Sequence, residues 1–254
     1  MTDDLFDTDE SPGASRLALG PGAVLLRGFA RPLAGDLPAE IAAIARQAPW
    51  RHMVTPGGRR MSVATTDCGA LGWVSDARGY RYSASDPESG QPWPAMPAAL
   101  KALAGEAAAE AGFAGFVPDA CLINRYAPGT RLSLHQDRDE HDLNAPIVSV
   151  SLGLPATFQW GGLARSDRAM RVPLRHADVV VWGREDRLRF HGVLPVPQGE
   201  HAEWGAFRVN LTFRKAGLTV PVQAALYRAP RARARHWPSA SRTCPDSDSA
   251  TPVA

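Results

Sequence analysis

The stretch of residues 147–162 reads IVSVSLGLPATFQWGG, and it sets the expectation for the whole fold. Val, Ile, Thr, Phe and Trp favour a pleated strand, whereas Gly153, Pro155 and the two closing glycines favour turns. Two short strands joined by a tight connection are therefore expected. Short strands in such close succession are typical of antiparallel sheets.

The same pattern of short strand-like runs, separated by Gly, Pro or Asp, continues on both sides from about residue 119 onward. Earlier, the sequence predicts a strand over 23–29, a helix over about 37–48, and a second helix from Pro97 to near Gly112. We therefore expect an α+β fold that is mostly β, a sandwich or barrel with the N-terminal helices packed outside it. The further strand-like runs are ACLINRYAPG, MRVPLRHAD, DVVVWGRE, RLRFHGV and FRVNLTFR.

The 254 residues are enough for one large domain, which we expect over residues 17–218. Residues 1–16 form an acidic leader, and residues 219–254 are rich in Arg, Pro and Ser, which predicts a disordered tail. Residues 50–96 form a long segment rich in Gly, Pro and aromatic residues. Loops this long in a compact domain usually carry function.

Composition excludes some classes of protein. No apolar run approaches the ~20 residues of a membrane span, and the acidic N-terminus is unlike a signal peptide, so we expect a cytoplasmic protein. Cys68, Cys121 and Cys244 are far apart and form no CxxC, which predicts reduced thiols, two of them buried. The net charge of +2 is too small to indicate nucleic-acid binding by itself.

Three histidines are followed two residues later by a carboxylate, so spacing alone does not identify a metal site. The pairs are His135/Asp137, His176/Asp178 and His201/Glu203. The first pair ends the alternating run RLSLHQD, and the polar face of this run needs a compensating partner if it points inward. The second pair lies at a turn, where its Asp is expected to organise the backbone and its His to be exposed, and the third pair lies in a loop.

His191 is the best candidate for a third ligand, because it closes the alternating run RLRFHGV and Gly192 leaves room beside it. Two histidines and one carboxylate leave coordination positions open, which suits ferrous iron and oxygen chemistry. Zinc with an activated water remains an alternative. The residues that follow, Glu140 to Asp142, are expected to form a solvated loop.

The run FRVNLTFR predicts an anion site. On a strand its two arginines, Arg208 and Arg214, share one face, opposite three apolar residues. Their guanidinium groups can converge on a gap that fits a short dicarboxylate, which Arg binds in a bidentate manner. A half-exposed edge strand is the alternative. The run ACLINRYAPG adds further polar groups on one face, and the candidates are Leu122, Asn124, Tyr126 and, from FRVNLTFR, Asn210 and Thr212.

Taken together, PDACLINRYAPG, LSLHQD, PIVSVSLGLPA, ADVVVWG and RVNLTFR resemble the AlkB family of iron(II)- and 2-oxoglutarate-dependent dioxygenases, close to its bacterial members. The resemblance covers roughly residues 20–217. It implies a double-stranded β-helix, or jelly roll, with iron on His135, Asp137 and His191. The residues that it implies for 2-oxoglutarate are Leu122, Asn124, Tyr126, Arg208, Asn210 and Arg214.

The family oxidises alkyl groups on nucleic-acid bases. The resemblance therefore implies oxidative dealkylation of bases such as 1-methyladenine and 3-methylcytosine, with O2 and 2-oxoglutarate converted to succinate and CO2 and an aldehyde released. The base must leave the stack and lie against an aromatic wall. The residues that match this substrate site are Trp73, Tyr80, Tyr82, Asp139 and Arg165. The resemblance also implies that the 50–96 segment is a nucleotide-recognition lid, in which Arg59 and Thr65 depart from the family pattern.

The expected partners are alkylated single-stranded DNA or RNA and O2, with no membrane, and the protein is expected to be a monomer. Two alternatives remain at this point. One is a 2-oxoglutarate dioxygenase that acts on RNA, protein or a small molecule. The other is a β-barrel that binds damaged DNA without catalysis, although such a module would not need an inward-facing Asp137.

Overall fold

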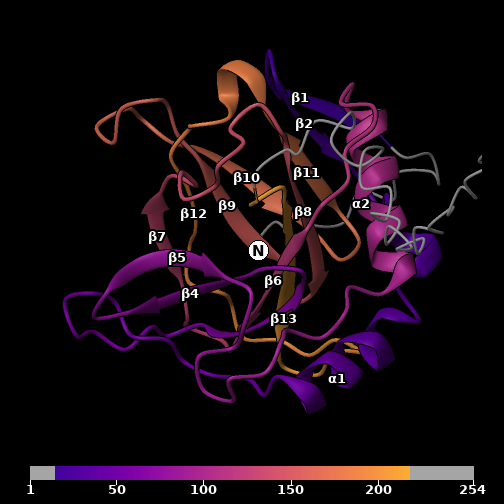
Figure 1. Ribbon diagram of the computed structural model, residues 1–254. Coiled ribbons are helices and arrows are strands. Elements are labelled where there is room, and N and C mark those ends of the chain that lie inside the picture. Colours follow the sequence, from indigo (N-terminus) through magenta and orange to yellow (C-terminus); the bar gives the residue numbers. More distant parts are fainter. Residues whose placement is uncertain (1–14, 218–254) are drawn as a thin grey trace, which may run out of the picture. The chain divides into compact units, whose positions relative to one another are not determined.

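The computed structural model describes residues 15–217 (Figure 1). Residues 1–14 of the predicted acidic leader and the whole predicted Arg-rich tail lie outside the described residues, whereas Arg16, the last residue of that leader, begins β1. The boundaries of the domain stay a prediction. The helices are α1 (Leu37–Gln47) and α2 (Ala98–Glu110), with short 3₁₀ turns at Arg31–Leu33 and Arg184–Asp186. The strands are β1 (Arg16–Gly20), β2 (Ala23–Leu26), β3 (Ala64–Gly69), β4 (Gly72–Asp76), β5 (Gly79–Ser83), β6 (Ala120–Tyr126), β7 (Leu132–His135), β8 (Ile147–Gly153), β9 (Ala156–Trp160), β10 (Met170–Leu174), β11 (Val179–Trp182), β12 (His191–Val193) and β13 (Arg208–Arg214).

These strands form two antiparallel sheets and a separate hairpin. The larger sheet has the order β1-β2-β11-β8-β13-β6-β3, and the smaller has the order β10-β9-β12-β7. Aromatic and aliphatic side chains from both sheets, among them Phe158, Trp160 and Trp182, pack together between them. Two packed antiparallel sheets with both helices outside confirm the predicted jelly-roll fold.

The centre of the larger sheet separates polar from apolar side chains by strand alternation. On β13, Val209, Leu211 and Phe213 enter the core beside the helices, whereas the residues between them face the smaller sheet. Its neighbours β6 and β8 follow the same rule in register. All seven residues of β13 are buried, so the alternative of a half-exposed edge strand is wrong.

Both helices cover the outer face of the larger sheet. Leu37, Ile41 and Ile44 of α1 and the small residues of α2 join a core with β8, β11 and β13. Figure 1 shows the two helices together on one side of the strands. Helix α1 ends one residue before the predicted boundary, and α2 begins directly after Pro97, so both helix predictions are confirmed. None of the helices within residues 15–217 could cross a membrane.

The 50–96 segment contributes to the core as well as to a lid. Strand β3, inside that segment, pairs with β6 and forms one edge of the larger sheet, which the sequence reading did not predict. Arg51 forms an ion pair with Asp86 and lies over the ring of Trp93, with 5.4 Å between its Cζ atom and the ring centroid. The pairing of β3 with β6 fixes the segment on the sheet, and the contacts of Arg51 join the two ends of the segment to each other.

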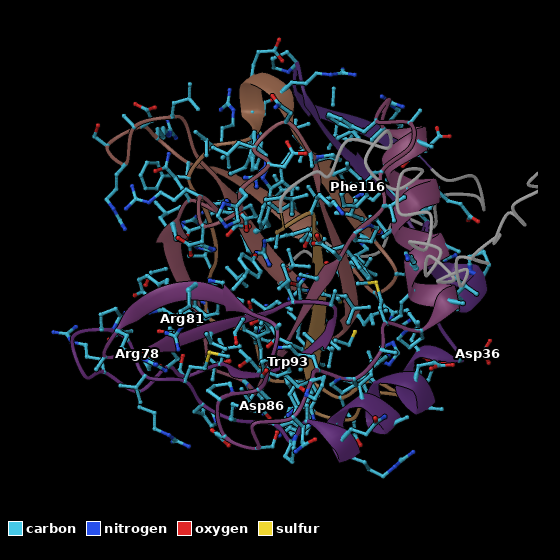
Figure 2. All side chains as sticks on the ribbon, in the orientation of Figure 1. Asp36, Arg78, Arg81, Asp86, Trp93 and Phe116 are labelled. Atoms are coloured by element: carbon cyan, nitrogen blue, oxygen red, sulfur yellow. The ribbon has the colours of Figure 1, made fainter. Side chains whose placement is uncertain are left out.

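The β4–β5 hairpin is the part of the segment that stands apart from both sheets. At its turn, Asp76 accepts hydrogen bonds from Arg78 and Arg81, which Figure 2 labels at the hairpin. Trp93 closes the base of the hairpin, because a Cβ atom on Gly72 would lie only 2.3 Å from the Trp93 ring. The hairpin is therefore a shaped platform rather than an irregular loop.

Some strand boundaries differ from the prediction. The first expected strand splits, because β2 ends at Leu26 and an unpredicted β1 precedes it. Strand β7 ends at His135, so Asp137 follows the strand instead of lying on it. His191 begins β12 rather than closing a strand. Cys68 and Cys121 are buried free thiols, as expected.

Leu211 tests the position of the core. It is fully buried at the centre of the larger sheet, so Leu211→Ala should lower the free energy of unfolding by about 2–5 kcal/mol. Chemical denaturation measures this change. Leu17→Ala, on an edge strand where the side chain is 48% exposed, should change it by less than about 0.5 kcal/mol. Equal effects of the two substitutions would contradict the assigned core.

Candidate metal and anion site

Two histidines and one aspartate lie close together beside β12 and β7, the last two strands of the smaller sheet. His135 and His191 are cross-strand partners in β7 and β12, and their ring centroids lie 4.4 Å apart. Asp137 lies between them: its carboxylate oxygens are 3.6 Å from His135 Nε2 and 3.7 Å from His191 Nε2. The close approach of the strands depends on Gly192, whose added Cβ would lie 2.7 Å from the carbonyl oxygen of Leu132.

The hydrogen bonds of the two rings prepare them to bind a metal. Nδ1 of His135 donates to the carbonyl of Ser133 at 2.9 Å, and Nδ1 of His191 donates to the carbonyl of Arg189 at 3.0 Å. Because a carbonyl only accepts, each neutral ring carries its proton on Nδ1 and leaves the Nε2 lone pair free. Both lone pairs face Asp137, as in metal sites whose ligands are oriented by such bonds.

A second cluster of possible ligands has the opposite arrangement. His176, His201 and Glu203 also lie close together, with 3.8 Å between His176 Nε2 and Glu203 Oε2. Here, however, Nδ1 of His176 accepts from the amide of Gly153, and Nδ1 of His201 accepts from the amide of Glu203. Each neutral ring therefore carries its proton on Nε2, where a metal would have to bind. This cluster does not suit a metal, and His176 is half-buried rather than exposed as expected.

Asp137 is a buried carboxylate that is kept ionised. Burial raises the pKa of Asp137, but Arg214 and the two histidines more than offset this effect, so the pKa lies well below its usual range. Arg214 donates to Asp137 Oδ2 from Nη2 at 2.7 Å and from Nε at 3.1 Å. Burial and the neighbouring His135 lower the pKa of His191 to about 4. At neutral pH Asp137 is therefore anionic and His191 neutral, as metal ligands must be.

Arg208 lines the same cavity as His135, Asp137 and His191, and it is incompletely paired. Its Nη2 donates to Ser151 Oγ at 3.0 Å, whereas Nε and Nη1 are buried without any partner within residues 15–217. The side chain is almost completely buried, and burial lowers the pKa of its guanidinium group. A buried cation with unused donors is unfavourable unless an anion completes it. Arg208 is therefore the best-defined anion site of the cavity.

Of the polar side chains that line the cavity with Arg208, some are free to donate hydrogen bonds to a ligand and one is already hydrogen-bonded within the protein. The amide of Asn124 and the hydroxyl of Tyr126 face the cavity and form no hydrogen bond within the described residues. Asn210, in contrast, uses its amide nitrogen on Ser149 Oγ and on the carbonyl of Val150. Asn124 and Tyr126 can thus bind a ligand directly, whereas Asn210 braces β13 against β8.

One cavity of about 710 Å³ brings together all the residues that the sequence predicted for the metal, the co-substrate and the substrate. Residues of β6, β8 and β13, of β7 and β12, and of the β4–β5 hairpin line this cavity. The part that the hairpin lines is called its mouth below. The predicted residues that line the cavity are Trp73, Tyr80, Tyr82, Leu122, Asn124, Tyr126, His135, Asp137, Asp139, Arg165, His191, Arg208, Asn210 and Arg214.

Sequence reasoning missed Glu140. The expectation of a solvated loop is wrong for this residue, which is buried and accepts hydrogen bonds from Tyr82 Oη at 2.6 Å and Arg187 Nη2 at 3.0 Å. It also forms an ion pair with Arg214 at 3.2 Å. Arg187 in turn donates to the carbonyl of Asp137. No local pattern could have found Glu140, because all its partners come from distant segments.

The mouth of the cavity carries stacked aromatic rings. Trp73 and Tyr80 stack with 5.5 Å between their centroids, and the indole Nε1 of Trp73 donates to Asp139 Oδ2 at 3.1 Å. The buried carboxyl of Asp67, whose pKa burial raises to about 7, accepts from the amide of Trp73. On the opposite side of the mouth, Arg165 lies over the ring of Phe190.

The two residues that depart from the family pattern occupy different places. Thr65 lines the cavity, and its buried hydroxyl has no partner within the described residues. Arg59 is exposed on the turn before β3, where its amide donates to Thr55 Oγ1 at 3.1 Å. Only Thr65 therefore changes the shape and polarity of the cavity itself.

Comparisons with known proteins agree with this geometry. Residues 22–214 match the family model of the 2OG-Fe(II) oxygenase superfamily. The chain is 58% identical to the alpha-ketoglutarate-dependent dioxygenase AlkB of Salmonella typhimurium, over 84% of this chain and 97% of that relative. It is 56% identical to the Escherichia coli protein of the same name, over 84% and 98%. The solved structure of OsALKBH1 superposes with a TM-score of 0.70 at 28% identity, covering 79% of this chain and all of that one.

The orientation of the ring nitrogens predicts which cluster binds metal. His135→Ala should weaken binding of Fe(II), or of Mn(II) as a redox-inert substitute, by more than about 100-fold, because a ligand is lost. His176→Ala should leave the affinity unchanged. Anaerobic calorimetric titration of both variants measures this difference. Equal losses would show that the second cluster binds the metal too.

The incomplete pairing of Arg208 predicts how its substitution changes both the KM for 2-oxoglutarate and the stability of the protein. Arg208→Gln should raise the KM for 2-oxoglutarate at least about 30-fold, since a buried charge-assisted contact contributes ~2 kcal/mol or more. The same substitution should raise the thermal stability of the ligand-free protein, because it removes a buried, half-paired cation. Arg46→Gln, at an exposed position on α1, is the control for both measurements. An unchanged KM would place the anion elsewhere.

Proposed function

Because the chain belongs to the AlkB dioxygenases of the 2OG-Fe(II) oxygenase superfamily, we propose that it repairs alkylated nucleic-acid bases by oxidation. It is an enzyme that uses Fe(II) and 2-oxoglutarate. The substrates we propose are N-alkylated bases such as 1-methyladenine and 3-methylcytosine, in single-stranded DNA and also in RNA. The observation that carries the proposal is a single cavity that joins a two-histidine, one-carboxylate site to an unpaired buried arginine.

His135, Asp137 and His191 are the residues we assign to iron. Two neutral imidazole nitrogens and one carboxylate leave the remaining coordination positions for other ligands. When bound, iron and 2-oxoglutarate supply the oxidation: O2 converts 2-oxoglutarate to succinate and CO2 and hydroxylates the N-alkyl carbon, whose adduct releases an aldehyde. Arg214 holds Asp137 ionised and in place, so its first task is to position a ligand.

Arg208 is the residue we assign to the distal carboxylate of 2-oxoglutarate. Two of its donors, Nε and Nη1, are buried without a partner within residues 15–217, and Asn124 and Tyr126 add donors in the same cavity. Burial raises the pKa of Tyr126 to about 12, so its hydroxyl stays a donor at neutral pH. The other end of the acid then points toward the histidines. Leu122 completes the wall, and Asn210 keeps β13 in register.

Trp73 and His135 line the cavity at its mouth, and we propose that the base enters between them. Adenine methylated at N1 and cytosine methylated at N3 are cationic, so an aromatic face and a carboxylate favour them over the normal bases. Asp139 supplies that carboxylate and also holds the Trp73 ring. Tyr80, Tyr82 and Arg165 form the rest of this wall.

Strand preference, oligomeric state and location belong to the proposal as well. A base must leave the stack to reach the candidate metal site inside the cavity, and single strands present such a base at the lowest energetic cost. We propose a monomer that acts in the cytoplasm. The enzyme's family membership contradicts the alternative of a non-catalytic binding module. Turnover on methylated oligonucleotides distinguishes nucleic acid from the alternative substrates, protein or a small molecule.

The test is turnover on defined oligonucleotides. Purified protein with Fe(II), ascorbate and 2-oxoglutarate should release formaldehyde from single-stranded DNA that carries 1-methyladenine or 3-methylcytosine, with one succinate formed per formaldehyde. Asp137→Ala should lower the rate more than about 100-fold while the circular dichroism spectrum and melting temperature show a folded protein. His176→Ala is the matched control. Succinate without formaldehyde on every methylated DNA and RNA oligomer would refute the proposed substrate.

A further inference from the structure

We propose that four exposed arginines beside the cavity bind the phosphodiester backbone of the substrate strand beyond the base that enters the site. These residues, Arg165, Arg168, Arg171 and Arg175, are called the β10 arginine stripe below. The inference rests on the proposed function, because it assumes a nucleic-acid substrate. It adds a surface that extends away from the cavity and that would bind nucleotides which do not react.

The stripe runs from the mouth of the cavity along the outer edge of the smaller sheet. Arg165 lines the cavity, and the loop after it leads into β10, the edge strand of that sheet. From Arg171 to Arg175 exposed and buried residues alternate, so both arginines point outward on the same side. Side chains on one face of a strand repeat every ~6.6 Å, which lets a row of cations follow an extended polyanion.

None of the stripe's side chains has an acidic partner among residues 15–217. Asp167, the nearest acid in sequence, accepts a hydrogen bond from the amide of Ala164 and so organises the loop. Asp178 is buried and occupied by Arg27 and by the backbone amides of Gly28 and Arg175. Some surface arginines are paired, as Arg78 and Arg81 are with Asp76, whereas others, such as Arg46 and Arg59, also lack an acidic partner within residues 15–217. The stripe differs from these because its four arginines follow one another from the mouth of the cavity to one edge strand and along it. The stripe is thus an uncompensated row of positive charge.

The surface around the stripe is also shaped. Arg168, Ala169, Met170 and Arg171 line an open depression outside the main cavity. Met170, which lines it, is 47% exposed, and Leu163, in the loop that also carries Arg165, is 59% exposed. Cations set beside apolar surface are what binding of a single strand needs, because phosphates and bases lie on opposite sides of its backbone.

A simpler role for arginines on an edge strand is to prevent pairing with other strands. That role accounts for Arg171, which lies on β10, but not for Arg165 and Arg168, which lie in the preceding loop. It also does not require continuity with the cavity. The stripe therefore exceeds what protection of an edge needs.

The experiment compares two double variants with the same change of charge. Arg168→Gln/Arg171→Gln removes half of the stripe without touching a residue that lines the cavity. Arg46→Gln/Lys101→Gln removes two exposed cations from α1 and α2, which cover the other sheet. Binding of a methylated single-stranded DNA oligomer is measured at several salt concentrations, and turnover is measured on the same oligomer and on a methylated dinucleotide.

The stripe variant should give a salt slope that is shallower by ~1.4, about 0.7 for each lost phosphate contact on a single strand. Its KM for the oligomer should rise several-fold, with kcat unchanged and with unchanged kinetics on the dinucleotide, which is too short to reach the stripe. The control variant should match the unsubstituted protein. Oligomers with the methylated base near the 5′ end and near the 3′ end show which flank the stripe binds.

An unchanged salt slope in the stripe variant, or an equal change in the control, would overturn the inference. Loss of affinity on the dinucleotide would overturn it too, because the effect would then come from the cavity. These outcomes are separate from failure of the proposed function, in which the unsubstituted protein itself would not release formaldehyde. A parallel series on RNA of the same sequence shows whether the stripe binds RNA as well as DNA, by the same decrease in salt slope.

Discussion

The burial of polar side chains on the inner face of β13 constrains the rest of the structure. Arg208 and Arg214 lie on a central strand with almost no access to solvent. Arg214 is compensated from within, by Asp137 and Glu140, whereas Arg208 keeps two donors unused. A fold that buries an arginine in this state is complete only with an anionic ligand, so the chemistry of the site is part of the stability of the sheet.

Strand alternation explains why so much of this site could be predicted from the sequence. On β6 and β13 every second residue faces the cavity, and a period of two is visible in a single run of letters. His135, Asp137 and His191 were found in the same way, although Asp137 lies after its strand and His191 begins one. The predicted residues line one cavity because their side-chain directions survive small errors in strand boundaries.

The features that the sequence could not supply depend on partners far apart in the chain. Glu140 reads as a loop residue until Tyr82, Arg187 and Arg214 are brought around it. Strand β3 reads as part of a lid because its partner β6 follows only after a helix. The distinction between the two histidine clusters is another case, since a carbonyl or an amide beside Nδ1 is a property of the backbone fold.

The same network connects the mouth of the cavity to the candidate metal ligands. Tyr82, on the β4–β5 hairpin, donates to Glu140, and Glu140 pairs with the arginine that holds Asp137. Burial raises the pKa of the Tyr82 hydroxyl well above its ordinary value. The anionic groups Glu140 and Asp137 act in the same direction, and Arg214 acts in the opposite direction. The Tyr82 hydroxyl therefore stays a hydrogen-bond donor at neutral pH. A displacement of the hairpin therefore reaches Asp137 through three side-chain contacts, Tyr82–Glu140, Glu140–Arg214 and Arg214–Asp137, rather than through the backbone. Because packed, charged networks of this kind settle in discrete arrangements, the hairpin and the metal ligands are expected to adopt their working geometry together.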